Sequence, residues 1–258
     1  PETVGKGYLE KFVKQMPNVI DLADGIITVS NHSKNDILKF FPMDKNKIFV
    51  TPLAADEKYK PLEKDKCKYS IKINYNINNP FILYIGGFSP RKNVSSLITS
   101  FSKIHKNLDK NYDLIIIGSN KDDLDILKNL SIDLNIKDNV KFTGFVEEKM
   151  LPIFYNACDA FIYPSSYEGF GLPPLEAMSC GTPVITSDTS SIPEVVGDGG
   201  ILINPSDIKS LMYSIEALLN DESIRKELSL KALNQASKFS WEKTSENTIR
   251  AYKKILDM

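Results

Sequence analysis

The chain of 258 residues is 42% hydrophobic, 25% charged and 10% aromatic, which is typical of a folded globular protein and excludes a disordered or collagen-like chain. Its 32 lysine and arginine residues against 33 aspartate and glutamate residues give a formal net charge of −1. No global positive field is therefore present to hold a nucleic-acid backbone or an anionic bilayer, and any anion bound here needs a local pocket.

Short apolar runs rich in β-branched residues alternate with amphipathic stretches along the chain. The apolar runs predict strands at residues 25–29, 48–51, 81–85, 114–117, 140–142, 160–163, 183–186 and 201–203. The amphipathic stretches predict helices at residues 33–40, 94–105, 123–134, 149–157, 174–179, 207–219, 223–236 and 242–257. Because most of these strands are too apolar to leave one face in water, the pattern favours an α/β fold with a doubly wound, Rossmann-like parallel sheet.

The predicted strands fall into two groups of unequal size. Residues 1–56 carry two strands and one helix, too few to bury both faces of a parallel sheet, so we interpret them as the C-terminal remnant of a larger Rossmann-like domain. The Lys-rich, Pro-punctuated stretch 52–79 contains no long apolar run, and its first part is predicted to be an interdomain linker. Six strands then predict a complete domain over residues 57–240. The helix within 241–258 is expected to return toward the N-terminal domain.

The segment IGGFSPRKN, residues 85–93, follows a predicted strand and precedes a predicted helix. Gly86 and Gly87 allow the backbone to approach a ligand closely, and Arg91 and Lys92 supply positive charge. We expect a loop that faces phosphate groups. The alternative is that Arg91 and Lys92 are an exposed basic pair at a turn.

The densest signal is YPSSYEGFGLPPLEAMSCGTPVI, residues 163–185, which lies between two predicted buried strands. Gly169 and Gly171 permit a tight turn, and the prolines that follow suit the first turn of a helix. The amides of Phe170, Gly171 and Leu172 are therefore expected to point out of a helix N-terminus. Such amides form a cradle for an anion, and a diphosphate is the natural occupant.

Two glutamates flank this turn. Glu168 follows the strand 160–163, at the carboxyl end where open parallel sheets bind their ligands, and Glu176 comes eight positions later, about one turn inside the helix. One carboxylate can face a reacting group while the other reaches a sugar hydroxyl. Taken singly, each glutamate is equally well explained as a solvated side chain.

Several classes of site receive no support from the sequence. The three cysteines are widely and irregularly spaced and, with only two histidines, they form no metal-ligand pattern, so we expect no metal and a reducing, cytoplasmic setting. The opening residues show no basic-then-apolar leader, and runs such as 81–85 are far shorter than the roughly 20 residues of a membrane-spanning helix. We therefore expect neither secretion nor a transmembrane anchor. A Rossmann dehydrogenase is rejected, because residues 85–93 lack its Gly-rich fingerprint.

The segment 163–185 resembles the signature of glycosyltransferase family 4, which comprises retaining enzymes of GT-B architecture that take sugars from nucleotide diphosphates. The resemblance rests on two glutamates separated by seven residues around Gly-Phe-Gly-Leu, and it extends to GIITVSNHSKNDI, IFVTPLAAD, FILYIGGFSPRKN, VKFTGFV and FSWEKTSENTIRAYKKI in the family's order. It therefore covers nearly the whole chain. It implies that residues 1–56 belong to the acceptor-side domain and that residues 57–240 bind the nucleotide-sugar donor.

The resemblance also implies roles for individual residues. Glu168 stands next to the donor sugar, Glu176 binds the ribose hydroxyls, and Lys92 acts as a catalytic cation on the departing diphosphate. Many relatives have an arginine immediately after the first glycine of the phosphate-facing loop. Gly87 replaces that arginine here, so one of the two usual cations is missing unless Arg91 takes its place.

The loops after two further strands are implied to hold the nucleoside. Phe145 and Val146 follow the strand 140–142, where backbone groups of relatives read the edge of the base, and Gly118 and Ser119 follow the strand 114–117 at the same edge of the sheet. For the side chain of Phe145, a place in the core is the alternative interpretation.

The resulting functional hypothesis is a hexosyltransferase of surface-polysaccharide synthesis, with GDP-mannose as the first donor, a UDP-hexose as the second, and a glycan or lipid-linked acceptor. No cofactor is expected, and any peripheral membrane contact is expected through the acceptor-side domain. The alternative from another class is a nucleotide-sugar-binding module that does not catalyse transfer by itself. Binding of donor without turnover by this chain would agree with both hypotheses.

Overall fold

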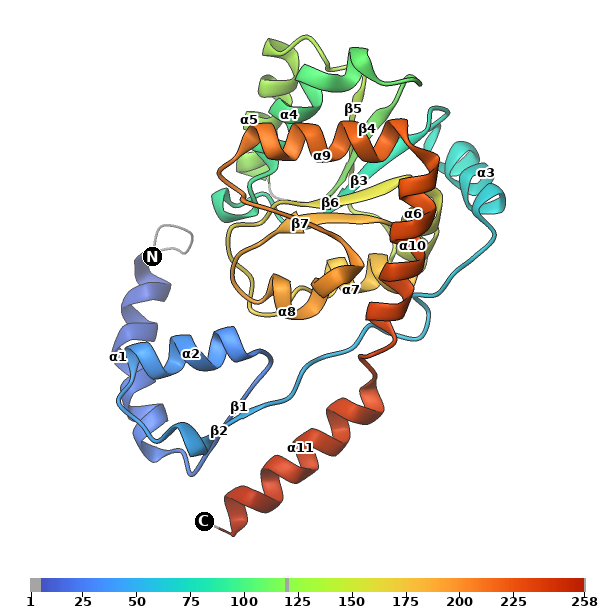
Figure 1. Cartoon of the computed structure of the whole chain (residues 1–258). Coiled ribbons are helices and arrows are strands. Elements are labelled where there is room, and N and C mark those ends of the chain that lie inside the picture. The colour runs from blue at the N-terminus through green and yellow to red at the C-terminus, as the bar shows by residue number, and fades with distance from the viewer. Residues whose placement is uncertain (1–5, 119–120, 258) are drawn as a thin grey trace. The chain divides into compact units, whose positions relative to one another are not determined.

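The computed structural model describes residues 6–118 and 121–257 (Figure 1). These residues form two compact units, which are treated one at a time. Unit 1 combines Pro1–Ala54 with Phe239–Met258, and unit 2 is Ala55–Lys238. Each predicted strand and helix is found within two residues of its expected bounds, and three helices appear that the sequence pattern did not predict.

Unit 1 contains a two-stranded parallel sheet in which Ile26 lies opposite Ile48. Its elements are α1 (Lys6–Leu22), β1 (Ile26–Thr28), α2 (Asn31–Phe40), the short η1 (Lys45–Lys47), β2 (Ile48–Val50) and α11 (Trp241–Leu256). The last helix joins the unit through the Thr244 hydroxyl, which donates to the Pro52 carbonyl at 2.7 Å. Helix α1 is absent from the sequence prediction because it contains Pro17, a residue that usually ends or kinks a helix.

Unit 2 is built on a six-stranded sheet in which every neighbouring pair is parallel. Its strands are β3 (Phe81–Ile85), β4 (Asp113–Ile117), β5 (Val140–Gly144), β6 (Ala160–Tyr163), β7 (Val184–Ser187) and β8 (Ile201–Ile203). Their spatial order is β5-β4-β3-β6-β7-β8, so the direction of winding reverses between β3 and β6. The predicted doubly wound α/β fold is therefore confirmed, and the reversal marks the place where such sheets bind ligands.

Helices cover both faces of this sheet (Figure 1). They are α3 (Lys64–Tyr75), α4 (Val94–Ile104), α5 (Lys121–Asp133), α6 (Leu151–Ala157), α7 (Leu172–Ser179), α8 (Ile192–Val196), α9 (Ile208–Asn220) and α10 (Glu222–Ala236). Helix α4 packs against α5 and α9, whereas α6 packs against α3 and α7. The short connections η2 (Pro90–Lys92), η3 (His105–Asn107), η4 (Glu148–Met150) and η5 (Gly197–Gly199) are 3-10 turns.

Two helices of unit 2 were not predicted, for different reasons. Helix α3 is rich in lysine and buries only Cys67 and Ile71, so its apolar face is too narrow to give a clear helical period. Helix α8 is only five residues long. Both lie in stretches where charge and short length hide the helical pattern.

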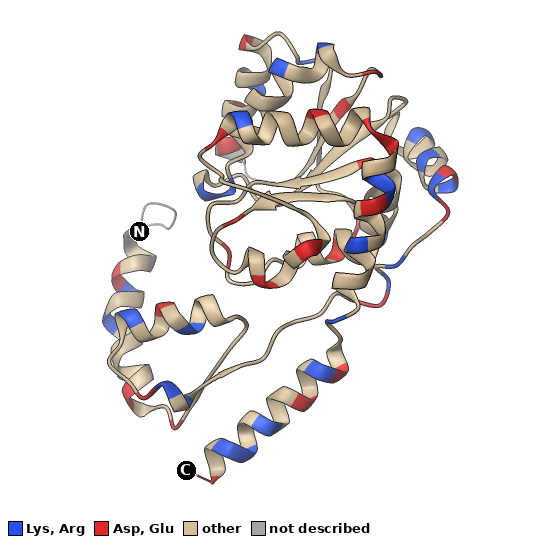
Figure 2. Ribbon diagram, in the orientation of Figure 1, with Lys and Arg blue, Asp and Glu red and all other residues tan. Residues whose placement is uncertain are grey.

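The core of unit 2 consists of its strands and the helix faces that meet them. Side chains that are fully buried include Tyr84, Tyr112, Tyr155, Tyr163, Phe101, Phe154 and Phe161. Among the strands of both units only Asp113 and Lys141 are charged, and they pair at 2.7 Å. Figure 2 accordingly shows charged residues mainly on helices and loops, with both signs interspersed. No helix within residues 6–118 and 121–257 is both long and apolar enough to cross a bilayer.

Candidate functional site

The candidate site lies at the carboxyl ends of β3 and β6, where the sheet reverses its winding. The loop after β3 and the loop after β6 are tied together through the backbone of Arg91. Its carbonyl oxygen accepts the Ser166 amide at 2.7 Å, the Ser166 hydroxyl at 3.0 Å and the Ser165 hydroxyl at 3.2 Å. Hydrogen bonds thus join the two segments that the sequence analysis identified, 85–93 and 163–185.

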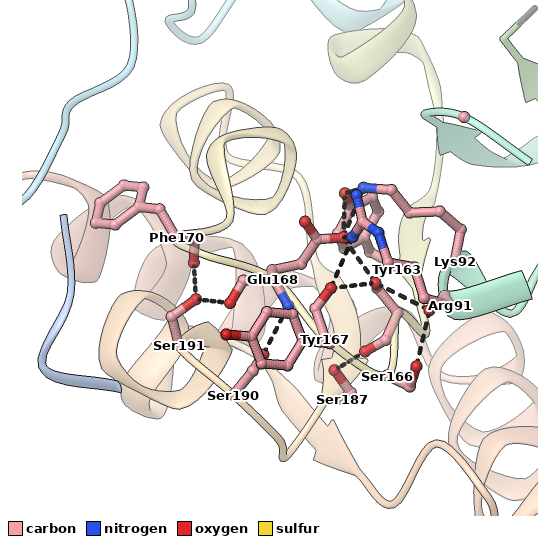
Figure 3. Close-up of polar contacts among 12 residues, drawn as sticks. Arg91, Lys92, Tyr163, Ser166, Tyr167, Glu168, Phe170, Ser187, Ser190 and Ser191 are labelled. Carbon is pink, nitrogen blue, oxygen red and sulfur yellow. Dashed lines mark hydrogen bonds and ion pairs between the residues drawn. The ribbon is translucent and has the colours of Figure 1, made fainter. Parts of the chain in front are cut away.

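Glu168 is the centre of this structure, and its side chain is only 12% exposed. Four donors converge on the single oxygen Oε1 (Figure 3). They are Lys92 Nζ at 2.6 Å, Ser165 Oγ at 2.6 Å, Tyr163 Oη at 3.0 Å and Arg91 Nη1 at 3.0 Å. Among the described residues, the donors named above all meet Oε1 and none meets the other oxygen, Oε2.

Electrostatics keep Glu168 ionised. Burial by itself would raise the pKa of this carboxyl, but the hydrogen bonds from Lys92 and Ser165 and the charges of Lys92 and Arg91 outweigh burial and lower the pKa below its ordinary value. Glu168 is therefore a permanent negative charge near neutral pH, suited to holding cations and accepting hydrogen bonds from hydroxyl groups.

Lys92 is buried in the same network. Its ammonium lies 2.6 Å from Tyr163 Oη and 5.0 Å from the centre of that ring, and its side chain is 12% exposed. Burial lowers the pKa of Lys92, against the opposing pull of Glu168. The alternative of an exposed basic pair is therefore wrong for Lys92. Arg91 is more open, at 34% exposed, and also donates to the Tyr167 carbonyl at 2.7 Å.

The glycines of the β3 loop permit a close approach of two backbones. A Cβ atom on Gly118 would lie 2.1 Å from the Gly86 carbonyl oxygen, and the Gly86 amide donates to the Ile117 carbonyl at 3.0 Å. Gly87 faces open space instead, because a Cβ atom there would meet nothing within 4 Å, and its carbonyl accepts the Tyr84 hydroxyl at 2.7 Å. Ser119, the other residue predicted at this edge, lies outside the described residues.

The two residues predicted after β5 differ in burial. The Phe145 side chain is 84% exposed, so its alternative interpretation as a core residue is wrong, whereas Val146 is only 5% exposed and packs inside. The turn between strand and loop is made by Gly144, whose φ of +70° lies in the left-handed region. The structure thus leaves the aromatic ring of Phe145 accessible to solvent.

The predicted anion cradle is the start of α7. After Gly169, Phe170 is 6% exposed, and Figure 3 shows its ring on the far side of Glu168 from Lys92. Gly171 has a φ of +120°, and a Cβ there would lie 2.8 Å from Ile192 Cδ1. Two prolines follow Leu172 within the helix and carry no amide hydrogen. The helix therefore offers only a few amides, chiefly those of Gly171 and Leu172.

Glu176 belongs to a different environment from Glu168. Its Oε2 accepts the Tyr155 hydroxyl at 3.0 Å, and burial raises the pKa of Glu176 to about 7 against the hydrogen bonds of Tyr155 and Tyr59. No contact recorded among the described residues joins it to the Arg91–Lys92–Glu168 network. The structure therefore brings together Glu168, Lys92 and Arg91 and sets Glu176 apart from them.

Several residues of the site were not predicted from the sequence. Tyr163 and Ser165 lie inside the recognised segment without an assigned part, and Tyr59 and Tyr155 belong to other segments. A hydroxyl at the last position of a buried strand, as in Tyr163, is the signal that could have revealed one of them. Within residues 6–118 and 121–257, no group of three His, Cys, Asp or Glu side chains is placed to hold a metal ion.

Comparison with known proteins gives consistent similarities. The family model described as "Glycosyl transferases group 1" matches residues 65–239. The chain is 35% identical over 254 residues to O-antigen chain mannosyltransferase B of Escherichia coli, covering 98% of this chain and 66% of that protein. It is also 35% identical over 191 residues to O-antigen chain mannosyltransferase RfbU of Salmonella typhimurium, covering 74% of this chain and 50% of that protein.

Solved structures show the same fold at lower sequence identity. The structure of Anabaena Alr3699/HepE in complex with UDP and glucose matches all of this chain and 70% of its own, with a TM-score of 0.84 at 19% identity. The sucrose-phosphate synthase of Thermosynechococcus elongatus matches 96% of this chain and 62% of its own, with a TM-score of 0.82 at 23% identity. The chain thus spans about two thirds or less of the length of the curated relatives above.

Proposed function

The chain belongs to the group 1 glycosyl transferases, and from that premise we propose that it binds a nucleotide diphosphate sugar and takes part in retaining transfer of a hexose. The proposed product is a surface polysaccharide, built on a glycan or lipid-linked acceptor. Two similar proteins are named as O-antigen chain mannosyltransferases, which supports mannose as the sugar and GDP-mannose as the donor. A UDP-hexose is the second choice of donor.

The observation that carries this proposal is the network of Lys92, Arg91 and Glu168 at the reversal of the sheet. Negative charge grows on the phosphate oxygens as the bond from the anomeric carbon to the diphosphate breaks. Lys92 is fixed by Glu168 Oε1 and Tyr163, so its charge is in place before the reaction begins. A cation or hydrogen-bond donor that is held in place in a site without water can stabilise the transition state by about 3 to 4 kcal/mol.

The remaining parts of the site have complementary roles in this proposal. The amides of Gly171 and Leu172 hold the phosphate oxygens at the start of α7, and Gly86, Gly87 and Gly118 let the backbone approach the donor. Glu168 Oε2 accepts a hydroxyl of the donor sugar, and Glu176 accepts the ribose hydroxyls. Phe145 and Val146 lie beside the base. No metal or other cofactor is required in this proposal.

Calorimetric titration with GDP-mannose, GDP and UDP tests the proposal on this chain. We expect saturable binding of at least one nucleotide, with GDP-mannose and GDP preferred, and weaker binding by the Glu176→Ala variant. The matched control is Glu246→Ala, an exposed glutamate on α11. If neither GDP nor UDP binds at millimolar concentration, the proposed donor site is wrong.

A second function, donor binding without transfer, is favoured by the share of the relatives that this chain covers, 66% and 50%. In this proposal the chain binds the nucleotide sugar and turnover requires an acceptor-side domain. A transfer assay with the 258 residues alone distinguishes the two functions. Measurable transfer by the chain alone would overturn the binding-only proposal, and binding without transfer supports it.

A further inference from the structure

A group of hydroxyl side chains after β7 forms hydrogen bonds with the backbone around Glu168. This group, here called the hydroxyl clamp, consists of Ser187, Thr189, Ser190 and Ser191. The Ser187 hydroxyl donates to the Ser165 carbonyl, and the Thr189 hydroxyl donates to the Ser166 carbonyl at 3.0 Å. All four side chains of the clamp therefore contact one stretch of the β6 loop, because the two remaining serines contact Glu168 itself.

Ser190 and Ser191 hydrogen-bond to the two backbone polar groups of Glu168. The Glu168 amide donates to Ser190 Oγ at 3.0 Å, and the Ser191 hydroxyl lies 2.8 Å from both the Glu168 and the Phe170 carbonyl oxygens (Figure 3). The backbone of Glu168 is thus fixed at its N–H and at its C=O. Its side chain is fixed separately, by the donors that meet Oε1.

Two of the four clamp residues are buried, which indicates that their hydrogen bonds are specific. Ser187 and Ser191 are both fully buried at 0% exposure. A buried hydroxyl destabilises a protein unless it is hydrogen-bonded, and an alanine would fill either place without that requirement. Each of these hydroxyls has its partner in the β6 loop, so the loop and the clamp are matched to each other.

The backbone of Ser190 gives an independent sign of the same role. Its φ is +57°, in the left-handed region that glycine adopts easily and that other residues adopt at a cost in free energy. A glycine would fit this backbone better, but it has no Oγ to accept the Glu168 amide. The residue present is the one that supplies the acceptor.

We infer that Ser190 and Ser191 are positioning residues for Glu168: they fix its backbone so that its carboxylate meets Lys92 and Arg91 in the reactive arrangement. This inference rests on the proposed function, because it assigns the clamp to the transfer reaction. The serines do not contact the donor in this account. They act through Glu168, so their effect must disappear when the Glu168 carboxylate is removed.

The test introduces Ser190→Ala and Ser191→Ala into a form of the protein that is long enough to transfer sugar. A small displacement of a reacting group can cost up to about a hundredfold in rate, so we expect kcat to fall about ten- to a hundredfold while the donor KM changes less than about twofold. The matched control is Ser229→Ala, which removes a hydroxyl that donates to the Gly181 carbonyl at 2.6 Å. We expect this control to leave kcat unchanged.

A double-mutant cycle separates positioning from a general loss of structure. On a Glu168→Gln background, Ser190→Ala and Ser191→Ala are expected to lower kcat by less than about twofold further, because their effect runs through the missing carboxylate. If the serine variants lower kcat by the same factor on the Glu168→Gln background as in the unaltered protein, the inference is wrong. An unchanged kcat in the single variants would also overturn it. If no length of the unaltered protein binds or transfers a nucleotide sugar, the proposed function itself fails.

Folding of the variants is checked separately, so that the inference stays testable if one of them is unstable. Ser190→Gly removes the same acceptor but relaxes the left-handed backbone, and it is expected to lower kcat as Ser190→Ala does. A Ser190→Gly variant with full kcat would contradict the assigned role of the Ser190 hydroxyl even if the alanine variants failed to fold.

Discussion

Glu168 and Glu176 stand eight positions apart in the chain, and their surroundings shift their pKa values in opposite directions. Hydrogen bonds and positive charges lower the pKa of Glu168, whereas burial raises the pKa of Glu176 to about 7. At neutral pH the first is therefore ionised and the second is about half protonated. This difference separates a fixed charge that holds cations from a carboxyl group whose hydrogen bonding changes with pH.

The first prediction concerns the pH dependence of donor binding. Ribose hydroxyls donate more strongly to a carboxylate than to a neutral carboxyl, so GDP-mannose should bind more tightly as pH rises through about 7, by up to about tenfold. GDP-mannose is the suitable probe because its diphosphate has no terminal phosphate that titrates in this range. Glu176→Gln should bind the donor weakly and with a flat pH profile. A pH-dependent profile in Glu176→Gln would assign the titration to another group.

The second prediction concerns stability. Because the pKa of Glu176 is raised on folding, its stabilising contribution is complete below the unfolded-state pKa and is lost as pH rises through the folded-state value of about 7. Glu176→Gln keeps a side chain that can accept the Tyr155 hydroxyl but cannot ionise. Its thermal midpoint at pH 8 should exceed that of the unaltered chain by about 2 °C or more, with little difference at pH 5. Equal midpoints at pH 8 would contradict the raised pKa.

The third prediction concerns Lys92. Lys92→Met removes the buried ammonium while leaving Ser165, Tyr163 and Arg91 to satisfy Glu168 Oε1, so the fold should persist. We expect kcat to fall about 10²- to 10³-fold in the length of the protein that transfers sugar. Lys103→Met, which changes an exposed lysine on α4, is the control and should keep its activity. Full activity in Lys92→Met would remove this residue from the site.

The fourth prediction is a gain of affinity at Gly87. A side chain there meets no atom within 4 Å of its Cβ, so Gly87→Arg should fold normally. If the β3 loop faces the diphosphate, the added cation should tighten GDP binding about two- to fivefold, and the gain should shrink at high salt. Gly87→Gln is the neutral control. An arginine variant that binds GDP no better than the glutamine variant would place the phosphates away from this loop.

The fifth prediction concerns the neighbouring Gly118, where the opposite result is expected. Its Cβ would lie 2.1 Å from the Gly86 carbonyl oxygen, which is backbone and cannot rotate away. Gly118→Ala should therefore lower the thermal midpoint and weaken nucleotide binding together, because the β3 loop must shift. Thermal unfolding and calorimetry measure both effects, and an unchanged midpoint would show that the loop has room to adjust.

The fold of unit 2 was well predicted from the sequence because each of its strands can be recognised from its own residues. Runs such as Phe81–Ile85 are apolar at every position, as strands buried on both faces must be. Helix α3 was missed because lysines surround its two buried residues, and α1 was missed because of Pro17. The apolar period that sequence analysis depends on is weak in α3, whereas in α1 the internal proline argues against a helix.

The site was only partly predictable, because its residues lie far apart along the chain. Glu168, Lys92 and Arg91 could be named because each lies in a recognisable loop, but that they share one carboxylate oxygen depends on β3 and β6 being neighbours. The contact of Ser191 with Glu168 joins residues 23 positions apart, on loops after different strands. Patterns within one segment carry no information about such pairs, so the hydroxyl clamp appears only in the structure.

A crystal structure of this chain with bound GDP-mannose tests the central claim most directly. We predict that the two phosphates lie within hydrogen-bonding distance of Lys92 and of the Gly171 and Leu172 amides, with Glu176 at the ribose and Glu168 Oε2 at the sugar. Phosphates bound elsewhere on unit 2, or a sugar that touches neither glutamate, would contradict the account.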